Sequence, residues 1–269
     1  MTSGAALSKL RPPAPKSSLI VPAGVLGALA LTIWAASDQF GIGFDPIAIL
    51  ADIGRGSEIL GEVFRPNFAF FPRTIQPMIE TIQMAIIAST IGCAIALPAA
   101  FLASRVTAPG RLSLVATRSV LNVVRALPDL LYAMVFVVAL SIGPLPGILA
   151  LIFFNIGVAA KLLSETVDAV DRGPLEAASA AGAAHVEVVR TSVLPQVLPN
   201  YVAYSLYVFE LNIRASTVIG IVGAGGIGNV LNEQIGFFNF SNVGLVILEL
   251  FLLVFAIELV SIALRRRLT

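Results

Sequence analysis

Three pairs of oppositely charged residues lie in stretches of this sequence that are otherwise apolar, and four positions separate the members of each pair. The pairs are Arg125 with Asp129, Lys161 with Glu165, and Glu210 with Arg214. Residues four apart share one face of a helix, so each carboxylate is expected to hold the cation beside it. An arginine can also form two parallel hydrogen bonds to a tetrahedral oxyanion, which a lysine cannot.

Arg214 is therefore a candidate for contact with a transported anion. A charge near the centre of a bilayer costs at least about 2.5 kcal/mol, so it should face a cavity or a partner. Asn212, Ser216 and Thr217 add neutral polar groups around it. Asn212 and Ser216 share a helix face, whereas Arg214 points about 200° away, so one regular helix cannot present all of them to one ligand. Arg125 is a second candidate, although it could extend its head group to water.

The sequence gives little support for an enzymatic or metal-binding site. The chain has one histidine, His185, one cysteine, and neither a GxSxG nor a Walker A motif. One histidine cannot build an HExxH or three-histidine metal site. Asp168 and Asp171 are expected to be solvated charges, and His185 to face solvent or a partner. We expect no metal site and no hydrolase or ATPase activity in this chain.

A glycine-rich segment matches the letters of the dinucleotide-binding fingerprint. Its glycines are Gly223, Gly225, Gly226 and Gly228. That fingerprint requires a βαβ unit in a soluble domain, and the only correctly spaced acidic residue, Glu249, lies in an apolar run. We expect these glycines to form a gate or to allow close helix packing.

The elements that position these residues are predicted to be membrane helices. Of the 269 residues 57% are hydrophobic and only 12% are charged, and the mean hydropathy is +0.93. This composition and the net charge of +1 exclude a disordered chain, a coiled coil and a soluble nucleic-acid binder. Because a span needs about 20 apolar residues, we expect an all-α integral membrane protein with six transmembrane helices, at 18–37, 76–103, 119–141, 146–169, 197–221 and 242–264. The sequence Gly143–Pro146 is expected to form the turn between the third and fourth helices.

The distribution of positive charge predicts the orientation. Eleven Lys and Arg residues fall in segments on the side of the N-terminus and three fall on the other side, which predicts that both termini are cytoplasmic. We expect four regions: a cytoplasmic tail at 1–17, an uncleaved first helix with an extracytoplasmic amphipathic segment at 18–73, a transmembrane domain at 74–264, and a basic cytoplasmic tail at 265–269. The amphipathic segment should lie on the membrane surface.

The longest predicted cytoplasmic loop, Asp168–Leu198, contains two short helical patterns of small residues. Gly173-Pro174 begins the first, Gly182 ends it, and the second, at 186–193, leads to Leu194-Pro195. Such a compact knob suits a groove on a cytoplasmic partner, because Ala and Gly allow another backbone to come close. The alternative is a simple polar loop.

Three segments resemble a known family. Glu176-Ala177-Ala178, Gly182 and Leu194-Pro195 resemble the EAA signature of permease subunits of ABC importers. Two further segments, Asn122–Pro128 and Glu210–Gly228, are similar to the phosphonate-transporter permease subfamily. The resemblance covers roughly residues 74–264.

This resemblance implies a type I ABC importer permease in the bacterial cytoplasmic membrane. It implies two copies of the chain, two cytoplasmic ATPase subunits that bind ATP and Mg, and an extracytoplasmic solute-binding protein. The chain itself would hold no cofactor and catalyse no reaction. Within the coupling loop at 171–195, the resemblance assigns the ATPase contact to Glu176, Ala177, Ala178, Gly182, Leu194 and Pro195.

The implied solute is phosphonate or a related phosphorus oxyanion, such as phosphate or phosphite, moved by alternating access. Arg214, Asn212, Ser216, Thr217 and Arg125 are the candidates for its pathway. Two alternatives remain open: a secondary transporter of small anions and a membrane-embedded lipid-modifying enzyme. The first often shows two matched halves, and the second needs clustered carboxylates or a nucleophile beside a base; the sequence shows neither pattern.

Overall fold

The computed structural model describes residues 20–37 and 53–266, and the regular structure in these ranges is entirely helical. The predicted tail at 1–17, residues 18–19 and 38–52, and the last three residues lie outside the described residues. Internal contacts divide the chain into two units, Met1–Glu58 and Ile59–Thr269. The first unit contains α1 (Ile20–Ala36), an apolar helix of 17 residues at the position of the first predicted span.

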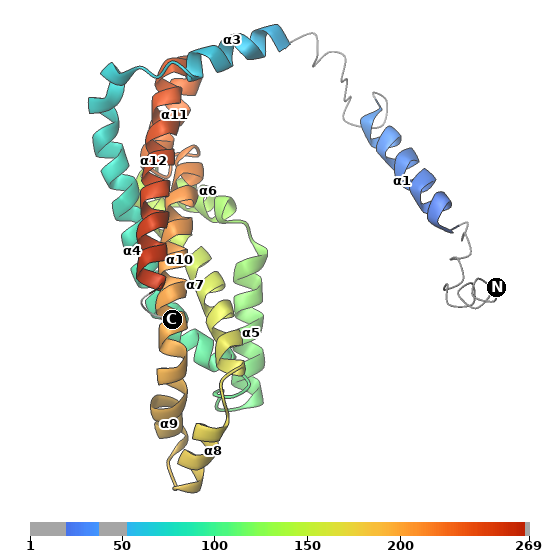
Figure 1. Ribbon diagram of the computed structural model, residues 1–269, viewed down its shortest axis with the longest axis vertical. Helices are drawn as coiled ribbons and strands as arrows, with labels where there is room; N and C mark the ends of the chain where they lie inside the picture. The colour runs from blue at the N-terminus through green and yellow to red at the C-terminus, as the bar shows by residue number, and fades with distance from the viewer. Residues whose placement is uncertain (1–19, 38–52, 267–269) are drawn as a thin grey trace, which may run out of the picture. The chain divides into compact units, whose positions relative to one another are not determined.

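The second unit contains the elements that carry the candidate site residues (Figure 1). It begins within α3 (Ile53–Val63), an amphipathic helix in the predicted amphipathic segment. The helices that follow are η2 (Phe68–Phe70), α4 (Phe71–Ala103), α5 (Arg111–Ala126), α6 (Asp129–Leu140), α7 (Pro144–Asp168), α8 (Gly173–Ala180), α9 (His185–Val188), the π-helical turn η3 (Val189–Val193), α10 (Leu194–Gly220), α11 (Ile227–Gly236) and α12 (Phe240–Arg265).

Three of the described helices, α4, α7 and α12, are long and apolar enough to cross a membrane by themselves. The bent pair α5 and α6 gives a fourth span if it is counted as one. α10 has 27 residues, but polar side chains lower its hydropathy, and α1 is shorter than the roughly 20 residues that a straight span needs. The count of six spans therefore stays a prediction.

The prediction of one continuous helix at 119–141 is wrong. α5 ends at Ala126, Leu127 is extended, and α6 begins at Asp129 with its axis turned by 82°. The cause is Pro128, which disfavours helical geometry in the residue before it and has no N–H to donate.

The break also prevents the predicted ion pair between Arg125 and Asp129, because the two residues no longer share a helix face. The Oδ1 atom of Asp129 instead accepts a hydrogen bond of 2.9 Å from the backbone N–H of Leu130. A turn separates α6 from α7, but it lies at residues 141–143 and not at Gly143–Pro146: α6 ends at Leu140, and Pro144 is already the first residue of α7.

α4 and α7 pack closely because small residues line the contact. The buried face of α4 is formed by Ala85, Ala88, Gly92, Ala96 and Ala100, among others. A Cβ atom added to Gly92 would lie 2.5 Å from the Cβ atom of Asn155 on α7, so a larger side chain has no room there. Small residues allow helix backbones in a membrane to approach and gain dispersion energy. We therefore regard α4 and α7 as one closely packed pair.

α8 and α9 form a projection at one end of the second unit, opposite α11 (Figure 1). α8 agrees with the first short helix predicted in the loop. The second short helix is not separate, since α9 and η3 continue directly into α10. At this junction the N–H of Leu194 donates to the carbonyl of Val189, five residues earlier, which is π-helical geometry. One continuous rod therefore runs from the projection to Gly220.

Candidate functional site

The turn at the end of α8 gives the projecting knob, residues 173–193, its shape. Gly182 has φ +84°, a conformation that side chains other than glycine adopt with strain. The N–H of Ala183 donates to Ala178 over 3.1 Å, and the N–H of Gly182 donates to Ser179 over 3.0 Å. These two bonds define a Schellman motif and satisfy carbonyls at the end of the helix. Backbone geometry therefore explains the glycine, because a Cβ atom there would meet nothing within 4 Å.

The residues predicted to contact an ATPase lie mostly on the outside of the knob. Glu176, Ala177, Gly182 and Pro195 are exposed, and Ala178 and Leu194 are half-buried. Apart from Glu176, the exposed members are small or compact. This surface allows another protein to come close to the backbone of α8.

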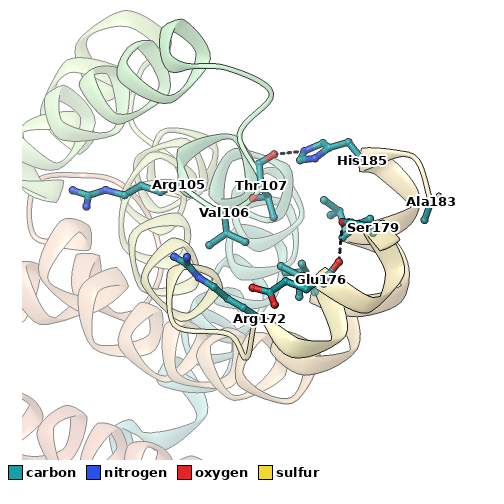
Figure 2. Close-up of a pocket in the computed structure, with 12 residues that line it drawn as sticks. Arg105, Val106, Thr107, Arg172, Glu176, Ser179, Ala183 and His185 are labelled. Carbon is teal, nitrogen blue, oxygen red and sulfur yellow. Dashed lines mark hydrogen bonds between the residues drawn. The ribbon is translucent and has the colours of Figure 1, made fainter. Parts of the chain in front are cut away.

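A groove of about 640 Å³ separates the knob from the loop between α4 and α5 (Figure 2). Arg105 on that loop, and Arg172 and Glu176 at α8, contribute its charged side chains. His185 closes one side: its Nε2 atom lies 2.9 Å from the carbonyl oxygen of Thr107. Because a carbonyl only accepts, the histidine donates from Nε2. His185 is exposed as predicted, but it also ties α9 to the α4–α5 loop.

Asp168 ties the same loop to α5 and α7. Its Oδ1 atom accepts hydrogen bonds from the Ser104 hydroxyl and from the Arg105 backbone N–H, both over 2.6 Å. Its Oδ2 atom accepts from the Nη2 atom of Arg118 over 2.9 Å, and Nε of Arg118 donates to Ala103 over 2.7 Å. We call Ser104, Arg105, Arg118 and Asp168 the Asp168 clasp. The prediction that Asp168 is only a solvated charge is wrong.

Glu210 is the centre of a second charged cluster. It is 7% exposed, and its Oε1 atom pairs with Arg214 in the predicted manner. Its Oε2 atom lies 3.3 Å from the Nη2 atom of Arg265, the last residue of α12. Glu210 is therefore level with one end of α12, and Arg214 lies about 6 Å further along α10.

The structure separates Arg214 from the other pathway candidates. The Arg214 side chain is 51% exposed, whereas Asn212 and Ser216 are completely buried on another face of α10. Thr217 is half-buried, and its hydroxyl donates to the carbonyl of Ile213 over 3.2 Å. Arg125 lies on α5, where its Cγ atom packs beside Gly157 of α7. These residues do not form one binding site in this conformation.

The predicted glycine-rich segment is the loop between α10 and α11. Gly223, Gly225 and Gly226 have φ values of +90°, +85° and +71°. The backbone N–H of Gly143, before α7, donates to the Gly223 carbonyl over 3.0 Å. A Cβ atom on Gly225 would lie 2.8 Å from the Cα atom of Pro144, so the loop packs closely against the α6–α7 turn.

α4 supplies two caps for this loop. Glu80 accepts a hydrogen bond from the N–H of Gly226, and Thr81 accepts one from the N–H of Ile227, each over 2.8 Å. A carboxylate and a hydroxyl there satisfy free N–H groups at the start of α11 and favour its dipole. The backbone of α10 lies against Gly228, where a Cβ atom would collide with the Thr217 carbonyl. The roles of Glu80 and Thr81 have no signal in the local sequence, because 146 residues separate each from its partner.

Comparisons with known proteins agree on one family. A family model described as the inner membrane component of binding-protein-dependent transport systems matches residues 92–269. The phosphite transport system permease protein PtxC of Stutzerimonas stutzeri is 36% identical over 242 residues, which cover 90% of this chain and 86% of that protein. The phosphate-import permease protein PhnE of Mycolicibacterium smegmatis is 38% identical over 225 residues, 83% of this chain and 42% of that protein.

The fold also matches a solved transporter. A chain of the methionine ABC transporter MetNI in an inward-facing conformation superposes with a TM-score of 0.65. The match covers 76% of this chain and 99% of that chain at 23% sequence identity. The helical arrangement of the second unit is thus that of an ABC transporter permease.

Proposed function

This chain belongs to the family of inner membrane components of binding-protein-dependent transport systems, and we propose that its solute is a phosphorus oxyanion: phosphonate, phosphite or phosphate. A member of this family is a permease subunit of an ABC importer in the inner membrane, and a separate subunit hydrolyses ATP. Two relatives named for phosphite and phosphate transport support the choice of solute. The alternatives of a secondary transporter and a lipid-modifying enzyme have no support.

The partly exposed guanidinium group of Arg214 is the observation that supports this proposal. Glu210 holds one side of its guanidinium group, while half of the side chain remains exposed. An oxyanion that reaches Arg214 can accept two parallel hydrogen bonds in the plane of that group.

The continuous rod from the knob to Gly220 gives a physical route for coupling. In this proposal the ATPase contacts Glu176, Ala177, Ala178, Gly182, Leu194 and Pro195. A displacement of the knob then moves Glu210, Arg214 and the glycine-rich loop together, because η3 and α10 contain no break between them. Gly223, Gly225, Gly226 and Gly228 act as a gate or as close-packing positions at the far end of the rod.

The assembly that we propose has two copies of this chain, two ATPase subunits and one extracytoplasmic binding protein. Each copy has six spans with both termini in the cytoplasm, so the coupling loop at 171–195 faces the ATPase. The family's description supports the binding protein, and the structural neighbour is an ABC transporter. The excess of Lys and Arg on one side of the predicted spans supports the orientation.

Uptake measurements test the solute. In source cells with and without this chain, we would follow labelled phosphate with an excess of phosphite or of an alkylphosphonate as competitor. We also would compare growth with each compound as the sole source of phosphorus. We expect deletion to abolish either phosphate uptake or growth on one of the other two. Unchanged uptake and growth in all three cases would refute the proposed solute class.

A further inference from the structure

Exposed phenylalanine side chains gather at the end of the second unit that lies opposite the knob (Figure 1). Three of them lie where α3 leads through η2 into α4, and two lie in the turn between α11 and α12. The backbone N–H of Asn67 donates to the carbonyl of Ser241 over 3.1 Å, so the two segments lie side by side. We call these five residues the aromatic surface: Phe64, Phe68, Phe71, Phe237 and Phe238.

Side-chain contacts fix the two segments against each other. Asn67 donates to Asn242 over 2.9 Å, and Asn242 donates to Gln234 of α11 over 2.8 Å. A Cβ atom on Gly244 would collide with the carbonyl oxygen of Val63, so the end of α3 lies directly on α12. The aromatic surface is therefore formed in advance, and a partner that binds it has little ordering entropy to overcome.

Phe238 has a backbone conformation that phenylalanine disfavours. Its φ is +56°, and its N–H donates to the carbonyl of Ile235 while the next N–H donates to the carbonyl of Gln234, over 3.0 Å each. This Schellman turn ends α11, and glycine is the usual residue at its left-handed position. The Phe238 ring meets the edge of Phe240 with centroids 6.2 Å apart, yet 76% of the residue stays exposed. Strain that contacts within the chain do not offset indicates a contact outside it.

Each segment of the aromatic surface directly precedes a helix that can cross a membrane. Phe71 is the first residue of α4, and Phe238 lies two residues before α12. Exposed apolar side chains continue along one face of α4 from Phe71 through Ile75, Ile79 and Ile86. The aromatic surface is therefore continuous with an apolar strip that runs along a span.

Two exposed arginines stand beside the rings. Arg65 follows Phe64, and the Cζ atom of Arg73 lies 5.9 Å from the centre of the Phe70 ring. Aromatic and basic side chains together are typical of segments in the head-group layer, where rings contact acyl chains and cations contact phosphate groups. An extracytoplasmic binding protein would approach the same end, but it cannot reach the part of the apolar strip that lies along the span. These observations favour lipid.

We propose that the aromatic surface docks on the membrane, with phospholipid as its partner. Its rings enter the boundary between head groups and acyl chains, and Arg65 and Arg73 pair with phosphate groups of the lipid. This contact compensates for the strained backbone of Phe238. It also anchors α11, which directly follows the glycine-rich loop, at the membrane surface. The docking does not depend on which solute is transported.

Site-specific photo-crosslinking identifies the partner of these rings. Phe68 and Phe238 are replaced, one at a time, by the photoreactive analogue p-benzoylphenylalanine. The full chain is then illuminated with its ATPase in nanodiscs of phosphatidylethanolamine and phosphatidylglycerol, in the presence of the binding protein. We expect a phospholipid adduct on the chain at both positions, detected by mass spectrometry. A crosslink to the binding protein instead, or the absence of a lipid adduct at either position, would overturn the proposal.

Asn232 provides the control position. It is exposed on α11 and lines a polar pocket of about 410 Å³ with Glu80 and Glu233, so it faces water. The analogue at this position should give no lipid adduct. A lipid adduct there as well would mean that lipid reaches this end of the chain without a specific surface, and the aromatic surface would then not be the docking site.

The lipid composition of the adducts tests the two arginines. Phosphatidylglycerol carries a net negative charge and phosphatidylethanolamine does not, so Arg65 and Arg73 should enrich phosphatidylglycerol near the rings. The variant Arg65→Gln/Arg73→Gln should lower the share of phosphatidylglycerol among the adducts at position 68. Arg111→Gln is the matched control, because Arg111 is exposed at the start of α5, after the loop beside the knob. An equal share in both variants would refute the pairing of Arg65 and Arg73 with lipid.

Discussion

At the scale of single residues, Glu210 organises the charged cluster that we assign to the solute. One buried carboxylate contacts arginines from two helices, Arg214 on α10 and Arg265 at the end of α12. A buried carboxylate needs such partners, because its charge would otherwise lack compensation. The cluster thus has two positive groups around one negative group. An oxyanion can approach the exposed side of Arg214 without separating Glu210 from Arg265.

Arg214→Ala should reduce solute uptake at least tenfold without changing the amount of protein in the membrane. The reason is that the variant removes the planar donor group but keeps the helix. Arg214→Lys keeps the charge but not the paired donors, so we expect an intermediate loss. Uptake of the labelled solute, normalised to the amount of chain in the membrane, measures both effects.

Lys161→Ala is the control for this series. Lys161 pairs with Glu165 over 2.8 Å on the surface of α7, and their side chains are 44% and 59% exposed. Such exposed pairs contribute little to stability, so uptake should not change. Normal uptake by Arg214→Ala would show that this arginine has no part in solute passage.

At the scale of elements, the knob combines a fixed shape with an open surface. The Schellman bonds fix the turn at Gly182, and the π-helical turn at Val189–Val193 continues directly into α10. A protein bound at α8 is therefore connected to α10 through the Gly182 turn, α9 and η3. The space outside Gly182 is open, so it is available to a partner.

Gly182→Asn separates the shape of the turn from access to its surface. Asparagine tolerates positive φ better than other side chains, so the knob should keep its fold. The added side chain extends into the space where we place the ATPase. We expect less ATPase to co-purify with the chain, while insertion into the membrane stays normal.

Gly110→Asn provides the comparison, because Gly110 is an exposed loop glycine with extended backbone and open space around it. It belongs to the α4–α5 loop, outside the knob. This variant should retain the ATPase. If Gly182→Asn also retains the ATPase and full transport, the proposed contact surface is wrong.

At the scale of the whole molecule, α10 and the α4–α7 pair are linked near the knob. α10 carries the knob, Arg214 and the glycine-rich loop, while α4 and α7 form a close pair. The Asp168 clasp joins α4, α5 and α7, and His185 joins α9 to the same loop. Movement of the knob is therefore transmitted to α5 through this loop as well as along α10.

Asp168→Asn should weaken this transmission. The amide keeps the shape of the side chain but loses the negative charge that holds Arg118. A charge-assisted hydrogen bond of this kind contributes about 1.5–3 kcal/mol when it is well formed. Its contribution is smaller where the pair is partly exposed to solvent. We expect more ATP hydrolysed per solute transported, measured in proteoliposomes with the ATPase and binding protein.

Asp171→Asn is the control in that assay. Asp171 is exposed, and among the described residues its side chain accepts a hydrogen bond only from the nearby Gly173 N–H, over 3.0 Å. It should leave the ratio unchanged. An unchanged ratio for Asp168→Asn as well would mean that the clasp has only a structural role.

The sequence by itself determined the membrane class, the positions of α1, α4, α7, α10 and α12, the knob with its glycine turn, and the pairing of Glu210 with Arg214. These features depend on local hydropathy, helical spacing and glycine conformation, which are properties of neighbouring residues. The break at Pro128 also has a local cause, because a proline restricts the residue before it, although we predicted one continuous helix at 119–141.

The tertiary structure alone decided the Asp168 clasp, the second arginine on Glu210, and the caps from Glu80 and Thr81. The bonded partners among them are 50 or more residues apart. The periodicity of a helix relates only residues that are close in the sequence, so it cannot predict these pairs. Which side chain meets which carboxylate or amide is set by helix packing and register, and these follow from the close contact of small residues across the whole bundle.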